Sequence, residues 1–194
     1  MTEAEWLGQA QPRVMLAFVC PRTSDRKLRL FGCAEFRLQL RPPEDICDEY
    51  GYGILRVTER YADGQITADE LAQANERVRG DERDFYPSIA WFVSSDDVFL
   101  RGAAPRYLGR NSDIIRCVFG NPFRSITFLP DWRTSTAVTL AAQMYESRDF
   151  GAMPILGDAL QDAGCDNEDV LNHCREPGVH VRGCWVADLV LGKE

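Results

Sequence analysis

Lysine and histidine are scarce in this sequence of 194 residues. Lysine occurs only at positions 27 and 193, and histidine only at positions 173 and 180. The other basic residues are arginines, and acidic residues outnumber basic ones, so the formal net charge is −8. An acidic total argues against non-specific binding to nucleic acid, because the phosphate backbone attracts basic surfaces.

Long apolar runs are also missing. The run from Val14 to Cys20 is far shorter than the roughly 20 residues that a membrane-spanning helix needs. The acidic start, Thr2 to Glu5, is unlike the basic start of a signal peptide. The seven cysteines are an odd number and are spread along the chain, as expected for free thiols in a reducing compartment. We therefore expect a cytoplasmic protein without a membrane span.

Catalytic sequence motifs are missing as well. The chain has no P-loop, no GxGxxG, no GxSxG and no HExxH motif, and it has no internal repeat. These absences favour a non-enzymatic interaction or regulatory module whose partner is a protein. An enzyme with a site assembled from scattered residues stays open as an alternative, and no oligomeric state is indicated.

The hydrophobic pattern predicts a mainly α-helical protein, an irregular bundle of roughly eight to ten short helices with few or no strands. The clearest helical stripe steps by three or four residues and consists of Ile46, Tyr50, Ile54, Val57 and Tyr61. A second helix is predicted to follow the N-cap residue Ser24. Residues 36–40, within that second segment, alternate between apolar and polar types, which also fits a strand. We predict a helix there.

We expect residues 1–194 to form one helical domain. A sub-boundary is predicted in the loop 101–111, which is rich in glycine, proline and arginine. Residues 149–194 form a C-terminal helical module, with glycine stops at Gly164 and Gly192 and a carboxylate N-cap at Asp166. Its last helix is expected to begin near Arg182 and to bury Trp185 as an anchor.

The stretch from Asp63 to Leu71, DGQITADEL, resembles half of a calcium-binding loop. However, Tyr61 stands where such a loop needs a carboxylate oxygen. We therefore predict a turn at Asp63-Gly64, followed by a capping box of Thr67 and Glu70 at the start of the next helix.

Five potential metal ligands lie within twenty residues near the C-terminus: Cys165, His173, Cys174, His180 and Cys184. Thiolate and imidazole are the ligands of structural zinc sites. The spacing lacks the paired cysteines, such as C-x2-C, that one tight turn presents to a metal. Free cysteines are also among the most buried residues, so the simpler interpretation is a set of small core residues and two histidines outside any site.

If the cluster binds zinc, the predicted ligands are Cys165, Cys174, His180 and Cys184. His173 is left out because it adjoins Cys174, and neighbours on a helix point about 100° apart. Zinc is the one cofactor that the sequence suggests, and a zinc-binding protein is the first alternative to the interaction module. A Cys/His nucleophile pair has less support, since adjacency in sequence is not the spatial pairing that catalysis needs.

Six segments carry a resemblance over both ends and the middle of the chain: MTEAEW, SDRKLRLF, TERYADGQITADEL, FGNPFR, PILGDALQDAGC and HCREPGVHVRGCWVADLVLGKE. Together they resemble a large paralogous family of uncharacterised planctomycete proteins, most specifically in the ending HVRGCW followed by LGK. The resemblance implies no activity, ligand or catalytic residue.

Overall fold

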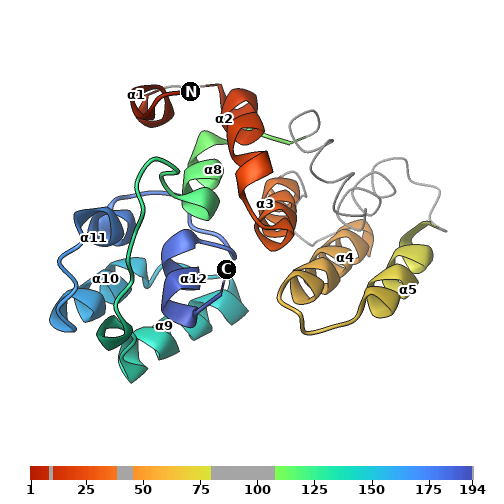
Figure 1. Ribbon diagram of the computed structural model, residues 1–194. Helices are drawn as coiled ribbons and strands as arrows, with labels where there is room; N and C mark the ends of the chain where they lie inside the picture. The colour runs from red at the N-terminus through yellow and green to blue at the C-terminus, as the bar shows by residue number, and fades with distance from the viewer. Residues whose placement is uncertain (9–10, 39–45, 80–107, 194) are drawn as a thin grey trace. The chain divides into compact units, whose positions relative to one another are not determined.

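The structure, a computed structural model, describes residues 1–8, 11–38, 46–79 and 108–193. These residues form ten α-helices and two short 3-10 helices, and no strand occurs among them (Figure 1). The prediction of a mainly α-helical protein is therefore confirmed. None of the described helices combines the length and the apolar character that crossing a membrane requires.

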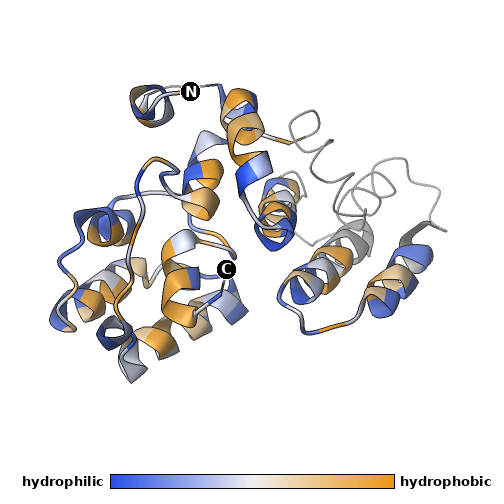
Figure 2. Ribbon diagram, viewed as in Figure 1, coloured by the Kyte–Doolittle hydropathy of each residue, from blue (hydrophilic) through white to orange (hydrophobic). Residues whose placement is uncertain are grey.

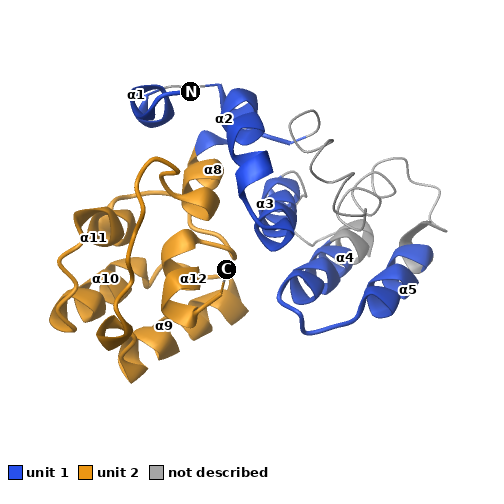
Figure 3. Cartoon of the chain, in the orientation of Figure 1, with its two compact units in different colours: residues 1–112 blue, residues 113–194 orange. Residues whose placement is uncertain are grey.

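The chain divides into two compact units, residues 1–112 and 113–194 (Figure 3). The expectation of one helical domain over residues 1–194 stays a prediction. The division lies just after the loop 101–111, in which the sub-boundary was predicted, although residues 101–107 lie outside the described residues. The predicted module 149–194 is the later part of unit 2.

Unit 1 is helical throughout its described residues. Its elements are α1 (Glu3–Leu7), α2 (Pro12–Val19), η1 (Cys20–Arg22), α3 (Asp25–Arg37), α4 (Ile46–Ala62) and α5 (Ala68–Arg79). α4 packs against both α3 and α5. The predicted N-cap Ser24 is confirmed, because its hydroxyl accepts the backbone N–H of Lys27 at 3.3 Å and α3 begins at the next residue.

The helix predicted over residues 36–40 is confirmed as far as the structure describes it. Arg37 is the last residue of α3 and Leu38 is its C-cap, whereas residues 39 and 40 lie outside the described residues. Every residue of α3 from Leu28 to Phe36 is buried, including the charged Arg29 and Glu35. The alternating segment lies at the end of this helix, where Phe36 is buried and Leu38 is 60% exposed.

Two carboxylates in and just before the stretch that resembled a calcium loop, Asp63 and Glu59, are engaged in ion pairs. Asp63 accepts a hydrogen bond from Arg26 at 2.9 Å. Glu59, which is 2% exposed, accepts two hydrogen bonds from Arg37 at 2.9 and 3.0 Å. In the described part of the chain, neither carboxylate belongs to a group that could hold a metal ion.

Thr67 and Glu70 form the predicted capping box in front of α5. The backbone N–H of Thr67 donates to Glu70 Oε2 at 2.8 Å, and the backbone N–H of Glu70 donates to Thr67 Oγ1 at 3.3 Å. The Thr67 hydroxyl also donates to Glu70 Oε2 at 3.1 Å. The backbone N–H and then the hydroxyl of Thr67 hold the pKa of Glu70 below its usual value.

We expect Thr67→Ala to lower the free energy of unfolding by about 1 kcal/mol, because it removes an N-cap. The folded pKa of Glu70 lies below its unfolded value, so its contribution is present at neutral pH and is lost as the pH falls through the folded pKa. The difference in the free energy of unfolding between Thr67→Ala and the wild-type protein should therefore be smaller in acid. Urea unfolding at about pH 7 and about pH 3 measures this difference. Thr67→Ser keeps the hydroxyl and is the control, and a calcium-dependent rise in Tm would contradict the capping-box interpretation.

Unit 2 is built from α8 (Ser112–Phe119, whose first residue belongs to unit 1), η2 (Pro130–Trp132), α9 (Ser135–Ser147), α10 (Met153–Asp162), α11 (Glu168–Arg175) and α12 (Trp185–Leu191). α10 packs against α9 and α11, and α12 packs against α9. Figure 2 shows apolar residues concentrated on α9, α10 and α12, whereas α11 is more hydrophilic. Each of these helices contributes buried side chains to a single core cluster, which also includes Cys117 of α8.

Glycines end two helical segments of unit 2 as predicted. Gly164 has φ 87° and Gly192 has φ 66°, a left-handed conformation that glycine adopts without strain. The predicted N-cap Asp166 is wrong by one residue. The side chain of Asn167 accepts the backbone N–H of Val170 at 3.1 Å and caps α11 instead.

The last helix begins three residues later than predicted, at Trp185 instead of near Arg182. Its buried residues are Val186, Ala187, Asp188 and Val190. Trp185 is only half-buried at the edge of the core, so the expectation that it is a buried anchor is wrong. The buried face of the helix lies one residue further along the chain than the sequence pattern indicated.

Candidate metal centre

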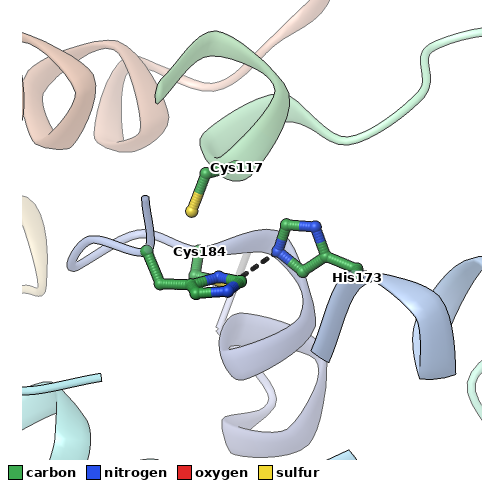
Figure 4. Close-up of side chains that lie close together, drawn as sticks. Cys117, His173 and Cys184 are labelled. Atoms are coloured by element: carbon green, nitrogen blue, oxygen red, sulfur yellow. Dashed lines mark hydrogen bonds between the residues drawn. The ribbon is translucent and has the colours of Figure 1, made fainter. Parts of the chain in front are cut away.

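Four side chains of unit 2 converge on one point: Cys117, His173, His180 and Cys184. One sulfur or ring nitrogen of each residue lies within 4.8 Å of those of the others. Among the described residues, this is the one group of cysteine, histidine and carboxylate side chains that could hold a metal ion. Figure 4 shows Cys117 projecting from α8 toward Cys184, while His173 reaches Cys184 from α11.

The four residues come from three separate segments of the chain. Cys117 lies in α8, and His173 lies in the last turn of α11. His180 and Cys184 lie in the connection between α11 and α12, with Cys184 as the N-cap residue of α12. The turn before Cys184 contains Gly183 with φ 94°, which glycine adopts without strain. Helix packing and one tight turn thus bring the group together.

The distances between the four ligand atoms would fit a small tetrahedral ion if the atoms moved slightly closer together. His173 Nε2 lies 3.2 Å from Cys184 Sγ. Zinc bonds of about 2.3 Å to sulfur and about 2.0 Å to nitrogen place neighbouring ligand atoms about 3.3 to 3.8 Å apart. The widest separation in the group, up to 4.8 Å, would therefore close by about 1 Å around an ion. Two thiolates and two imidazoles are a donor set that structural zinc sites use.

The surroundings of Cys184 favour its thiolate. Burial alone would raise the pKa of this thiol, since the side chain is 0% exposed. A hydrogen bond with Cys117, the positive charge of His173 and hydrogen bonds with His173 and His180 outweigh burial and hold the pKa well below its ordinary value. The thiolate is the form of cysteine that binds metal ions. The group is thus centred on a buried sulfur atom whose neighbours Cys117, His173 and His180 lower its pKa.

His180 contributes a polar atom that the protein itself leaves unsatisfied. Its Nδ1 is buried and has no hydrogen-bond partner among the described residues. A buried polar atom without a partner costs about 1–3 kcal/mol. A metal ion bound through Nδ1 would remove that cost, whereas an ion bound through Nε2 would leave it. The ring of His180 also meets the ring of His173 edge-on, with the two centroids 4.9 Å apart.

The structure brings two of the four predicted ligands, His180 and Cys184, into the group, and it leaves Cys165 and Cys174 outside. Cys174 lies where α10 and α11 approach closely, because a Cβ atom built on Gly157 would lie 2.9 Å from the Cys174 Cβ. Burial raises the pKa of both the Cys165 and the Cys174 thiol. These two cysteines are therefore core residues with protonated thiols.

Cys117 and His173 replace Cys165 and Cys174 in the candidate ligand set. His173 and Cys174 do point in different directions, as neighbours on a helix must, but His173 faces the group and Cys174 faces the core. The sequence therefore singled out Cys174, whereas the converging group in the structure contains His173. Cys117 was missed because it lies on another helix far upstream, where no local spacing connects it to the two histidines.

If the group holds zinc, its four protein ligands fit a structural site better than a catalytic one. Cys184 is 0% exposed and Cys117 is 1% exposed. Catalytic zinc sites keep one coordination position open for water or substrate, whereas four protein ligands close the site. The same burial argues against a Cys184–His173 nucleophile pair despite the 3.2 Å contact, because a substrate cannot reach the sulfur.

Comparison of the chain with protein-family models, with curated proteins and with solved structures gave no match. The resemblance to planctomycete proteins therefore stays a prediction. The function of the chain is inferred from its own residues alone.

Proposed function

We propose that the protein is a non-enzymatic zinc-binding module in which unit 2 holds one Zn²⁺ ion through Cys117, His173, His180 and Cys184. The observation that supports this proposal is the convergence of two buried thiols and two half-buried imidazoles at one point. A tetrahedral set of sulfur and nitrogen ligands favours zinc, whereas magnesium and calcium take oxygen ligands.

The proposed role of the ion is to connect three segments of unit 2: α8, α11 and the connection that leads into α12. Residues 176–179 of this connection are all exposed, so burial of apolar side chains contributes little to their order. A structural metal ion supplies folding free energy where apolar burial is limited. The ordered unit would then present its surface to a protein partner, the partner class that the sequence favours.

Metal analysis of the wild-type protein, purified without a metal-affinity tag, tests the proposal. We expect one equivalent of zinc per chain. Replacement of zinc by Co²⁺ should produce the sulfur-to-cobalt charge-transfer absorption of thiolate coordination, because cobalt takes the same tetrahedral geometry and absorbs light. A protein that retains no zinc and binds no Co²⁺ would refute the proposal.

Single substitutions identify the ligands. Cys117→Ser and Cys184→Ser should each remove one thiolate and reduce both the zinc content and the charge-transfer absorption. Cys165→Ala and Cys174→Ala are the matched controls, because they remove buried cysteines of the same unit that lie outside the group. If the controls lost zinc while Cys117→Ser retained it, the ligand set would be incorrect.

A further inference from the structure

Trp185 directly follows the proposed ligand Cys184 and is the first residue of α12. Its indole ring lies beside the imidazole of a second proposed ligand, His173. The two ring centroids are 5.2 Å apart and the ring planes are inclined by 49°. A half-buried tryptophan at the start of a helix thus packs against the imidazole of a proposed ligand.

The indole ring also touches the backbone just after α8. Gly120 has φ 63°, and a Cβ atom built on it would lie 3.2 Å from Trp185 Cγ and 3.3 Å from Trp185 Cδ2. A side chain at position 120 would therefore meet the indole more closely than ordinary van der Waals contact. Gly120 follows Cys117 by three residues, so this contact sets the separation between the end of α8 and the indole.

We infer that Trp185 is a positioning residue of the proposed zinc site. Its indole ring lies between the end of α8 and the imidazole of His173 and keeps them at a fixed distance. At that distance, Cys117 and His173 can bind the same ion as Cys184. This inference rests on the proposed zinc function. An indole ring suits the role because it is large and rigid, and few side-chain rotations are lost when it is held in place.

The effect expected from Trp185 is on the metal as well as on folding. Residues that orient the ligands of a metal site typically contribute about 10- to 100-fold to its affinity. Without the indole, the imidazole of His173 would lose the surface that limits its rotation, and the end of α8 could move toward the space left behind. The ligand atoms would then no longer be held at the separation that one ion requires.

Zinc affinity and the Co²⁺ absorption spectrum of three full-length variants test this inference. Trp185→Ala should weaken zinc binding by about 10- to 100-fold and shift the visible d–d bands of bound Co²⁺, which report ligand geometry. Trp185→Phe keeps an aromatic ring beside His173 and should retain most of the affinity and the wild-type band positions. Gly120→Ala places a methyl group against the indole and should also weaken zinc binding.

Phe128→Ala is the matched control. Phe128 is a partly buried aromatic residue on the same core, and it packs edge-on against Trp132 with the centroids 5.2 Å apart. This variant should lower the Tm but leave the zinc affinity and the Co²⁺ spectrum unchanged. A role of Trp185 in folding alone would make Trp185→Ala behave in the same way.

Two results would overturn the positioning role while the zinc proposal stands. In the first, wild-type protein binds zinc, and Trp185→Ala binds it with the same affinity and the same Co²⁺ spectrum. In the second, Trp185→Ala does not fold and Gly120→Ala binds zinc as the wild-type protein does. If the wild-type protein binds neither zinc nor Co²⁺, the proposed function itself fails.

Discussion

A chelator that removes zinc should lower the Tm of unit 2 sharply or unfold it. An ion that binds only the folded state stabilises that state by about 4 kcal/mol when free zinc is about 1,000 times its Kd. Without the ion, the buried Nδ1 of His180 has no partner among the described residues, and the four converging side chains lose the atom that would join them. The metal-free unit therefore loses the bonds to zinc that connect α8, α11 and the connection into α12.

Thermal unfolding followed by circular dichroism measures this effect with and without EDTA, and again after zinc is restored. The wild-type Tm should fall with EDTA and recover with zinc. The double variant Cys117→Ser/Cys184→Ser should have a low Tm that EDTA does not change, because it lacks both thiolates. A wild-type Tm that is insensitive to EDTA, in protein that contains zinc, would show that the ion does not stabilise the fold.

Much of the fold could be predicted from the sequence, because helix signals are local. The stripe from Ile46 to Tyr61 and the N-cap at Ser24 each lie within one helix and its cap. The capping box of Thr67 and Glu70 depends on residues three positions apart. Such features need no knowledge of what the helix packs against, so the sequence alone predicts them.

The errors in the helices came from tertiary packing. The face of α12 that carries Trp185 was expected to be buried. The core instead receives Val186, Ala187 and Val190, together with the polar Asp188. A sequence pattern treats a polar residue as exposed. Because Asp188 is buried with a specific hydrogen-bond partner, the pattern predicted the wrong face of α12.

The candidate site could be predicted only in part. His180 and Cys184 lie in a short connection between two helices, where their closeness in sequence makes their convergence plausible. Cys117 joins them through the packing of α8 on the core of unit 2, a contact between residues distant in sequence. The orientation of His173 depends on which side of α11 faces that core. Neither fact leaves a signal in the spacing of the cysteines and histidines.

A buried polar network holds the segment that carries Cys184. The hydroxyl of Tyr145 in α9 donates to Asp188 Oδ1 at 2.7 Å, and both residues are 2% exposed. The guanidinium of Arg182 lies 4.8 Å from the centre of the Tyr145 ring and donates to the backbone oxygen of Tyr145 at 3.4 Å. The backbone N–H of Asp188 donates to the carbonyl oxygen of Cys184 at 2.9 Å. The first turn of α12 is thereby connected to α9.

Asp188→Ala should lower the free energy of unfolding by about 2–3 kcal/mol, because it removes a buried hydrogen bond to a carboxylate and leaves the Tyr145 hydroxyl without that acceptor. Asp188→Asn keeps a side-chain oxygen and should cost less. Tyr145→Phe removes the other partner of the same bond. The double variant Asp188→Ala/Tyr145→Phe should therefore cost less than the sum of the two single variants, because no buried hydroxyl remains. Urea unfolding of the four proteins, each saturated with zinc, measures the coupling, and strictly additive effects would contradict a stabilising bond between Tyr145 and Asp188.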